Sequence, residues 1–418
     1  MMFYKETGFQ DSPVGKIPGD WDVRELGDES IANIIAGQSP PSSTYNKENV
    51  GLPFLQGKME FGEMFPSPTT YCSEPIKVAK KDDILLSVRA PVGDVNVAPF
   101  DCCIGRGLAA IRAKVDRLSH MFLFYYLKHE GKRFEALSTG STFKAIRIHE
   151  IERFSIPVPS LAEQRAIVGV LGVVDSAVGL VDRVIAKTER LKKGLMQQLL
   201  TRGIGHTEYK QTPIGTIPKE WQVTTTNDVT LFIKDGTHTP PKRIEKGIPL
   251  FSAQNIVDGK IVRTNEDTYI TEDDYWKIHT KYELQKNDVL LTIVGTIGNS
   301  AVVDVDYRFT LQRSVAIFRP DTSKLEPRFL HHVFQSQSFK RQLLGHSKLT
   351  TQGGVYLKEL SSLMIPVPPL QEQLKITDIL STVDKKIELE KEERARLERV
   401  KRSLMDLLLT GKIRVKVD

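Results

Sequence analysis

Residues 12–21 read SPVGKIPGDW, and residues 212–221 read TPIGTIPKEW. Two prolines, a glycine, an isoleucine and a tryptophan recur in register between the two decapeptides. A Pro-x-Gly turn followed by a second proline is common in loops. Five identities in ten positions at one spacing are not common, and they indicate an internal repeat.

The rest of the chain is doubled in the same order. The further matching pairs are KDDILLSVRAPVGD (81–94) with KNDVLLTIVGTIGN (286–299), GRGLAAIRAK (105–114) with QRSVAIFRPD (312–321), IPVPSLAEQR (156–165) with IPVPPLQEQL (365–374), and GLMQQLLTRGI (194–204) with SLMDLLLTGKI (403–413). The offset rises only from 200 to 209 residues along the chain. This period is too long for a solenoid repeat, so each copy should be a domain with its connection.

The composition is that of a globular protein with more than one core. The chain has 418 residues, 40% of them hydrophobic, and a net charge of +6. Basic and acidic residues are nearly balanced over 20–158 and 220–367, and the basic excess lies in 159–219 and 368–418. Charge alone therefore does not establish nucleic-acid binding, which would require basic residues clustered on one face.

The sequence contains neither an apolar run long enough to cross a bilayer nor a signal-peptide start, so we expect a soluble cytoplasmic protein. Cys72, Cys102 and Cys103 lack the spacing of a metal site. We expect buried thiols rather than disulfides, and no metal or cofactor.

Each copy divides at its IPVP motif. Before the motif, short apolar runs such as 84–88 and 289–294 are broken by glycine and proline and indicate strands. The stretches 119–137 and 325–344 have the pattern of amphipathic helices. We expect their aromatic side chains to lie in a core rather than to stack on bases.

After the motif, residues 161–201 and 370–410 contain no proline and place apolar residues three or four apart. This spacing predicts two long helices, each with a seam for another helix, beginning just after the prolines. Paired antiparallel, the two helices would bury each other's seams. Two globular domains would then lie at opposite ends of a rod, with the chain termini close together.

The ordered set of motifs resembles the specificity subunit of type I restriction–modification enzymes. The motifs that carry the resemblance are P-x-G-x-I-P-x-x-W, K-x-D-[IV]-L-[LF] before a glycine turn, I-P-[VL]-P-x-L-x-E-Q-x, and a helix end of the type L-x-x-L-[LF]-T-G-[KR]. Single motifs are weak, but the set occurs twice and covers essentially the whole chain.

The resemblance implies an α+β fold with two pseudo-symmetric target-recognition domains, separated by two long antiparallel coiled-coil helices. The implied parts are recognition domains at 1–158 and 205–367, and spacer helices at 159–204 and 368–418. In that family each domain reads one half of an asymmetric, bipartite sequence in double-stranded DNA. The helices fix the spacing and bind two methyltransferase subunits, and restriction subunits complete the complex.

The resemblance also implies that the chain itself catalyses nothing. The sequence agrees, because it contains no GxxxxGK[ST] loop, no N-P-P-Y-type methyltransferase motif and no nuclease carboxylate–lysine set. A non-DNA helical scaffold that carries two ligand-binding domains fits the helices and the balanced charge as well. Salt-dependent, sequence-selective duplex binding would separate these two hypotheses.

Candidate DNA contacts are polar residues in segments where the two copies diverge, such as 37–45 and 236–244. Arginine, lysine, glutamine and asparagine can address base edges or phosphates. The candidates are Lys58, Arg89, Arg106, Lys144, Arg147, Lys242, Arg243, Gln254, Asn255, Arg313, Lys348 and Gln352, with His238 in addition. For each, a solvated surface side chain is the alternative. For Arg106 and Arg313, a structural ion pair and a phosphate contact remain equally open.

Six further residues have expected structural or docking roles. Trp21 and Trp221 should anchor the entrance segments in the domain cores. Gly93 and Gly298 follow matching strands and should serve turns. The exposed faces of the long helices, including Lys192 and Lys193, should dock partner subunits.

Overall fold

The computed structural model describes residues 2–138, 145–239, 241–280, 282–347 and 354–417. The chain divides into two compact units. Unit 1 comprises Met1–Asp182 and Glu392–Asp418, and unit 2 comprises Arg183–Lys391. No helix of the described residues combines the length and the apolar character that a membrane span requires.

Each unit contains a four-stranded antiparallel sheet with the same strand order. The order in unit 1 is β11 (Val95–Val97), β10 (Ile84–Ser87), β13 (Leu108–Ala113), β5 (Ala32–Ala36). The order in unit 2 is β24 (Ser300–Val302), β23 (Val289–Thr292), β26 (Val315–Pro320), β18 (Thr230–Asp235). The apolar runs that predicted strands form the two central strands of each sheet, so the duplication of the sequence is a duplication of topology.

A second, smaller sheet accompanies each main sheet. In unit 1 its order is β6 (Tyr45–Asn46), β8 (Tyr71–Cys72), β7 (Leu52–Leu55), β12 (Cys102–Ile104), β9 (Val78–Ala79). In unit 2 its order is β22 (Thr268–Ile270), β19 (Ile248–Phe251), β25 (Thr310–Leu311). The pairs β7–β12 and β19–β25 are parallel, so both strands of each pair end at the same edge. Unit 2 also carries the hairpin β20 (Ile256–Val257)–β21 (Lys260–Ile261) and α5 (Glu272–Ile278).

Short helices pack against each main sheet. Those of unit 1 are α1 (His120–His129), α2 (Gly131–Leu137) and α3 (Ile148–Glu152), and those of unit 2 are α6 (Pro327–Gln335), α7 (Gln337–Ser347) and α8 (Leu357–Ser362). Phe122, Phe124, Phe329 and Phe334 are fully buried, which confirms that these aromatics are core residues. The prediction of one continuous helix in each copy was wrong. In unit 2, the extended backbone of Ser336 ends α6, and its hydroxyl caps Phe339 N of the next helix.

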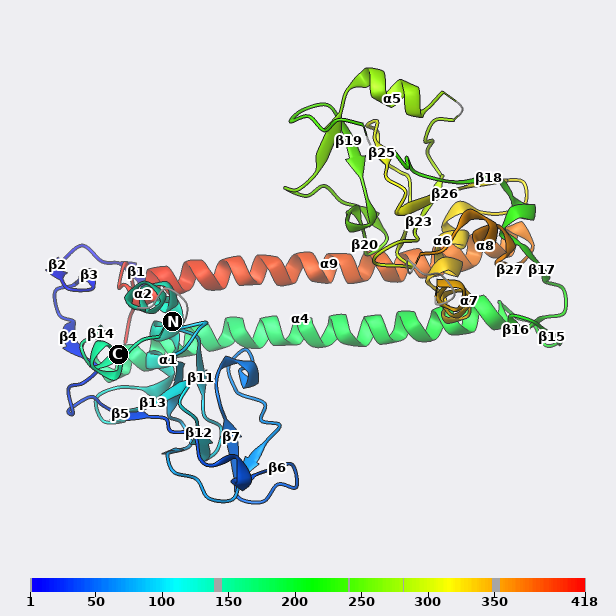
Figure 1. The fold of residues 1–418 in the computed structure, drawn as a ribbon. Helices are drawn as coiled ribbons and strands as arrows, with labels where there is room; N and C mark the ends of the chain where they lie inside the picture. Colours follow the sequence, from blue (N-terminus) through cyan, green and yellow to red (C-terminus); the bar gives the residue numbers. More distant parts are fainter. Residues whose placement is uncertain (1, 139–144, 240, 281, 348–353, 418) are drawn as a thin grey trace. The chain divides into compact units, whose positions relative to one another are not determined.

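The two long helices are α4 (Leu161–Arg202) and α9 (Leu370–Leu409). Within each unit the segments of α4 and α9 lie side by side and antiparallel (Figure 1). In unit 1 Lys401 bonds Asp175, and in unit 2 Lys192 lies 2.5 Å from Asp384. The prediction of a long antiparallel helix pair is confirmed. The expectation that Lys192 is free for a partner was wrong, because this ion pair places its side chain in the seam.

The IPVP motifs are strands rather than loops. β14 (Ser155–Val158) pairs with β4 (Asp22–Glu25), and β27 (Met364–Val367) pairs with β17 (Gln222–Thr225). Each motif ends just before a long helix, as the restriction of helix by proline requires. The IPVP motif therefore joins the start of each long helix to the entrance of its own unit.

The repeated decapeptides form the hairpins β2 (Phe9–Ser12)–β3 (Gly15–Pro18) and β15 (Tyr209–Thr212)–β16 (Gly215–Pro218). Gly93 and Gly298 have φ values of 96° and 95° in turns after β10 and β23, as predicted.

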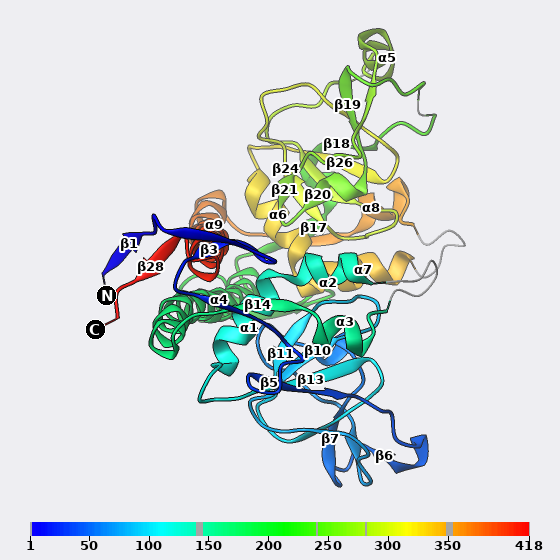
Figure 2. The same ribbon diagram turned by 90° about the vertical axis from the view of Figure 1, so that its left-hand side faces the viewer.

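The termini of the chain meet in unit 1. β1 (Phe3–Lys5) pairs antiparallel with β28 (Ile413–Val415), and Figure 2 shows the two ends next to each other. This confirms that the termini lie close together. Unit 1 is therefore built from both ends of the chain, whereas unit 2 is one continuous segment.

Candidate nucleic-acid interface

The tryptophans of the repeated decapeptides lock each unit to a long helix. Trp21 donates its Nε1–H to Glu163 Oε2 over 3.0 Å, and Trp221 donates to Glu372 Oε2 over the same distance. Both indoles are buried. The prediction that they anchor the entrance segments is confirmed, and the partner is the glutamate of the E-Q motif in each helix start.

The glutamine of the same motif is also structural. Gln164 and Gln373 are fully buried. Gln164 Oε1 accepts from Ser119 N over 2.7 Å, and Gln373 Oε1 accepts from Glu326 N over 2.9 Å. Each amide group therefore joins the first turn of a long helix to the residue that caps α1 or α6.

The aspartate of the K-x-D motif holds the main sheet together. Asp83 accepts from Arg112 Nε and Nη2 over 2.9 and 2.8 Å, and Asp288 accepts from Arg319 Nε and Nη2 over 2.7 and 2.8 Å. Such bidentate pairs fix geometry as well as adding energy. These aspartates serve the fold, so the candidates for DNA contact are the exposed polar residues in loop segments at the ends of the strands.

In unit 1 these segments converge on one group of loops, which we call loop cluster 1. It consists of residues 37–39, 56–58, 88–89, 105–107 and 145–147. Arg106 N donates to Ser39 Oγ over 3.2 Å, and Val88 N donates to Gly107 O over 2.9 Å. Ile146 N donates to Val88 O over 3.0 Å. Backbone groups of distant segments therefore hold the cluster in place.

Unit 2 has an equivalent group, loop cluster 2, made of residues 236–238, 252–254, 293–294 and 312–314. Arg313 N donates to Thr237 O over 3.1 Å. Ser314 joins two further segments, because its Oγ accepts from Ala253 N over 3.1 Å and its carbonyl accepts from Ile293 N over 2.9 Å. Arg106 and Arg313 occupy matching places in the two clusters.

A shared glycine permits each cluster to close. A Cβ on Gly37 would lie 2.2 Å from Gly105 O, and one on Gly236 would lie 2.2 Å from Leu311 O. No side chain fits at such a distance, so only glycine allows this approach of backbones. The glycine that begins both 37–45 and 236–244 is therefore a packing residue, and the residues after it are free to differ.

Several predicted DNA contacts belong to these clusters and are exposed: Lys58, Arg89, Arg106 and Arg147 in unit 1, and Gln254 and Arg313 in unit 2. Lys58 Nζ lies 2.7 Å from a carboxylate oxygen of Asp94. Within the described part of the chain, Arg106 and Arg313 form no ion pair, so their guanidinium groups face solvent.

The other predicted contacts have varied positions. Lys242 and Arg243 are exposed on the segment between β18 and β19. His238 is exposed, with Nε2 2.7 Å from Asp235 Oδ2. Lys144, Lys348 and Gln352 lie outside the described residues.

Asn255 is buried, and its amide is used within unit 2. Its Nδ2 donates to Val262 O over 3.0 Å and to Asp267 Oδ1 over 2.7 Å. The side chain stabilises the β20–β21 hairpin and is not accessible to DNA at the surface.

Sequence reasoning did not identify the residues that shape the clusters. Ser39 and Ser314 hold loops through their hydroxyls. No local pattern marks these residues, because their partners are distant in sequence.

Two buried cysteines and two buried histidines have shifted pKa values. Burial raises the pKa of Cys102 and of Cys103 to about 12, so these thiols stay protonated and are poor nucleophiles. Burial lowers the pKa of His331 and of His332 to about 3, which keeps both imidazoles neutral. No three metal-ligating side chains of the described residues lie together.

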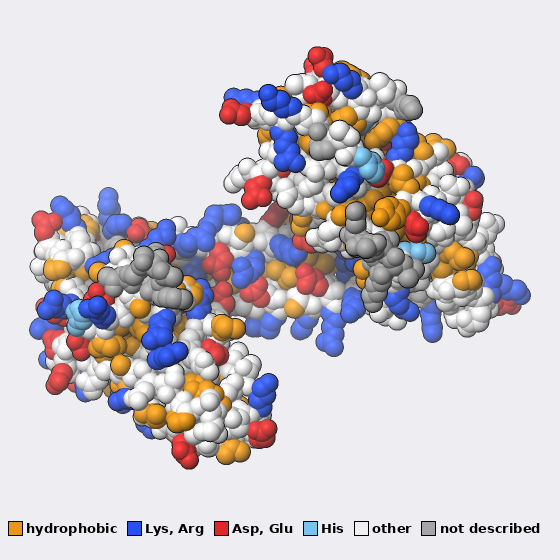
Figure 3. Space-filling view, in the orientation of Figure 1, with side chains coloured by type: hydrophobic (Ala, Val, Ile, Leu, Met, Phe, Trp, Pro, Cys, Tyr) orange, Lys and Arg blue, Asp and Glu red, His pale blue; other side chains and the backbone are white. Residues whose placement is uncertain are grey.

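Basic and acidic side chains are interspersed on the face drawn in Figure 3. A large uniformly basic surface is not visible there.

The chain matches a family profile described as the type I restriction modification DNA specificity domain, over residues 18–190 and 218–399. It is 28% identical to the type I restriction enzyme MjaVIII specificity subunit of Methanocaldococcus jannaschii, with 100% of this chain and 98% of the relative aligned. A putative MjaX specificity subunit from the same organism is 48% identical over 47% of each chain. The EcoBI specificity subunit of Escherichia coli is 24% identical over 83% of this chain and 76% of its own.

Two solved structures have the same fold. The S subunit of a type I restriction–modification system from M. genitalium has a TM-score of 0.57 at 18% identity, covering 93% of this chain and 96% of its own. A chain described under complex assembly and conformational transition of the type I R-M system has a TM-score of 0.58 at 19% identity, covering 95% and 99%. The chain belongs to the family of type I restriction–modification specificity subunits.

Proposed function

We propose that this chain gives its restriction–modification complex its DNA sequence specificity, with each unit reading one half of a bipartite, asymmetric target in double-stranded DNA. Loop cluster 1 would address one half and loop cluster 2 the other. The observation that carries the proposal is that one loop cluster is built twice, with an exposed arginine in the matching place and different polar neighbours around it.

The chemistry of the exposed residues suits this role. An arginine can donate two hydrogen bonds to O6 and N7 of guanine. A glutamine amide can bond both N6 and N7 of adenine. Lysines such as Lys58 and Lys242 would contact phosphates and fix the register. Hydrogen bonds from Arg106 N and Arg313 N fix the backbone at these positions, so only the side chains would need to be ordered when DNA binds.

The long helices would fix the spacing between the two half-sites and dock two methyltransferase subunits, with restriction subunits joining in the full complex. Exposed Lys193 is a candidate docking residue, whereas Lys192 is held in the seam. In this proposal the recognition domains are 1–158 and 205–367, the helical parts are 159–204 and 368–418, and the chain performs no catalysis itself. Its place of action is the cytoplasm.

The proposal is tested by exchanging residues 20–158 for the corresponding domain of another family member. Sequencing of methylated sites in a host that expresses the complex should show one half of the target replaced and the other half unchanged. The reciprocal exchange of 220–367 is the matched control, and it should change the opposite half. If both halves change together, or neither does, one reader per unit is wrong.

Binding of duplexes to the purified complex separates DNA reading from a scaffold role. Phosphate contacts release counterions, so affinity should fall steeply as salt rises. A complex whose affinity is insensitive to both salt and sequence would favour a scaffold.

A further inference from the structure

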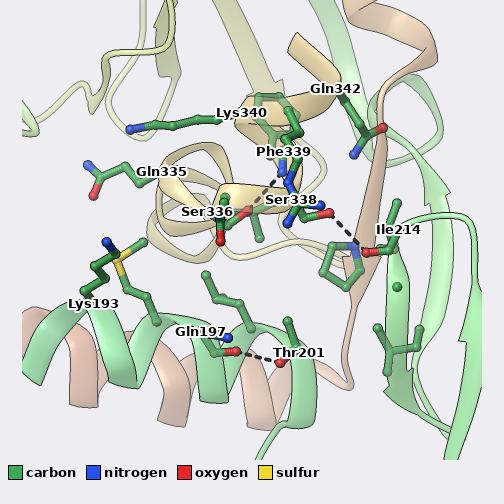
Figure 4. Close-up of a pocket in the computed structure, with 18 of the residues that line it drawn as sticks. Lys193, Gln197, Thr201, Ile214, Gln335, Ser336, Ser338, Phe339, Lys340 and Gln342 are labelled. Atoms are coloured by element: carbon green, nitrogen blue, oxygen red, sulfur yellow. Dashed lines mark hydrogen bonds between the residues drawn. The ribbon is translucent and has the colours of Figure 1, made fainter. Parts of the chain in front are cut away.

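Unit 2 contains a groove between the last part of α4 and helix α7, which we call the α4–α7 groove. It has a volume of about 750 Å³ (Figure 4). Its apolar lining residues include Met196, Leu200, Ile217, Val333, Phe339 and Pro366. All residues of the groove belong to one compact unit.

The rim of the groove is strongly basic. Lys193, Lys340 and Arg341 line it and are exposed, and none of the three pairs with a carboxylate among the described residues. Glu189 is the acidic member of the lining, and its carboxylate lies 3.6 Å from Lys391 Nζ. An acidic occupant would therefore meet cations that have no carboxylate partner in the described part of the unit.

The walls of the groove favour a helical occupant over an extended one. Backbone groups in α4 and α7 are already bonded within their helices, so an added strand would find few partners there. Two polar side chains of the lining are also engaged. Ser338 donates to Ile214 O over 3.1 Å, and Gln342 bonds the backbone of Met364. An apolar floor containing methionine beside a charged rim is the surface into which amphipathic helices dock.

The matching place in unit 1 is different. Met405, which follows Met196 by the 209 residues that separate the IPVP motifs, is only 6% exposed. Asp406 stands where unit 2 has Gln197, and it pairs with Lys412 at 3.0 Å. Unit 1 thus has a carboxylate and a covered methionine where unit 2 has a neutral side chain and an accessible one.

We propose that the α4–α7 groove binds an acidic amphipathic helix of a partner protein, with its apolar face on Met196 and Met364 and its carboxylates on Lys193, Lys340 and Arg341. The site belongs to unit 2 and is not duplicated in unit 1. Charge complementarity selects this occupant. The inference shares Lys193 with the proposed docking of methyltransferase subunits, and it does not depend on the proposed reading of DNA.

The test uses the full chain and two synthetic helical peptides of about 18 residues with the same leucine stripe, one flanked by glutamates and the other by lysines. Fluorescence anisotropy should show the acidic peptide binding at least about tenfold more tightly. The double change Lys193→Glu with Arg341→Glu should remove this preference. Arg402→Glu, at the position matching Lys193 in unit 1, is the control and should leave it intact.

Thermal melting followed by circular dichroism checks that each variant folds. If the double variant is unfolded, Lys340→Gln alone replaces it, with a smaller expected loss of about threefold. The proposal is overturned if the acidic peptide does not bind by about 1 mM. Equal binding of the two peptides, or displacement of the acidic peptide by duplex DNA, would also overturn it.

Discussion

Both units fasten a tryptophan to a long helix through a glutamate, but the third residue that contacts this glutamate differs between the units. In unit 1, Glu163 holds Trp21 and also accepts from Arg414 Nε and Nη2 over 2.6 and 2.8 Å. In unit 2, Glu372 holds Trp221 and contacts His206 Nε2 at 2.9 Å. The glutamate and the tryptophan are duplicated, but the third member is an arginine in one unit and a histidine in the other.

The difference follows from where the chain ends. Arg414 lies on β28, and it bonds Glu6 and Asp20 from the other end of the chain. His206 lies in the linker that runs on from α4 and needs no second chain segment. In unit 1, which consists of two chain segments, a network of Arg414, Glu163, Glu6 and Asp20 therefore holds the segments together. Unit 2 is one continuous segment, and its corresponding network is smaller.

Replacing the third residue, Arg414 in unit 1 or His206 in unit 2, should destabilise the two units unequally. This is the largest effect on unfolding free energy that we expect. Arg414→Met leaves Glu163, whose side chain is 3% exposed, without its cation, at a cost of about 3–5 kcal/mol of unfolding free energy. His206→Ala should cost about 1–2 kcal/mol, because Ile204 N and the indole still donate to Glu372. Hydrogen exchange read separately over each unit, together with urea unfolding, measures both.

The same comparison has a pH dependence. Hydrogen bonding to Arg414 lowers the pKa of Asp20 below its usual 3.8, and backbone bonding from Gly8 and then Arg414 lowers that of Glu6 below 4.5. Their stabilisation is therefore present above the unfolded values and is lost as pH falls through the folded ones. Protection factors over β1 and β28, that is, exchange rates relative to the intrinsic rate at each pH, should fall on acidification from pH 6 to 3, and less so in Arg414→Met. A variant that keeps the full acid response would contradict this.

The interhelical ion pairs give a second contrast. Lys401 is 8% exposed beside Asp175, whereas Lys192 is 21% exposed beside Asp384. Lys401→Met should cost about 2–4 kcal/mol, and Lys192→Met less, because solvent can hydrate the carboxylate that remains. Urea unfolding measures the difference. The double exchange Asp175→Lys with Lys401→Asp should recover part of the loss, and equal costs at both sites would show that exposure does not matter here.

Much of this fold could be predicted from the sequence because its signals are local and occur twice. The IPVP prolines and the apolar spacing after them predict α4 and α9 correctly, since proline restricts backbone and a seam has a period. The prediction of one helix over 325–344 was wrong, because the apolar spacing continues across the helix break at Ser336. Its hydroxyl begins a new helix without disturbing the apolar pattern on either side.

The interface could be predicted only in part. Residues such as Arg106 and Arg313 could be chosen because arginine can address base edges or phosphates, and because they occupy matching places in the two copies. Asn255 has the same chemistry but is buried, and sequence gives no measure of burial at a single polar position. Long-range partners such as Arg414 and Glu163 are 251 residues apart, so no local pattern relates them.

Replacing the matched arginines should separate the two units functionally. Arg106→Ala should weaken binding by about 1–3 kcal/mol and relax specificity in one half of the target, and Arg313→Ala should do so in the other half. Competition binding with duplexes altered in one half at a time reads this out. Uniform weakening across all sequences, with a shallower salt dependence, would instead make these arginines phosphate contacts.

The smallest effect should come from moving the open end of the chain from one unit to the other. β1 and β28 already pair, with Phe3 opposite Val415, so a linker of a few residues can join residue 418 to residue 1. Opening the chain between Gly205 and His206 then makes unit 2 the discontinuous unit. The cut falls in a segment without helix or strand, so no core element is removed. We expect a change in unfolding free energy within about 1 kcal/mol and an unchanged DNA target, measured by urea unfolding and methylation mapping. His206 would be left at a chain end, without a charged network like that of Arg414, so exchange should become faster around Glu372 than around Glu163. If unit 1 instead unfolds in the permuted chain, a covalent link between residues 418 and 1 cannot replace the free termini paired in β1 and β28.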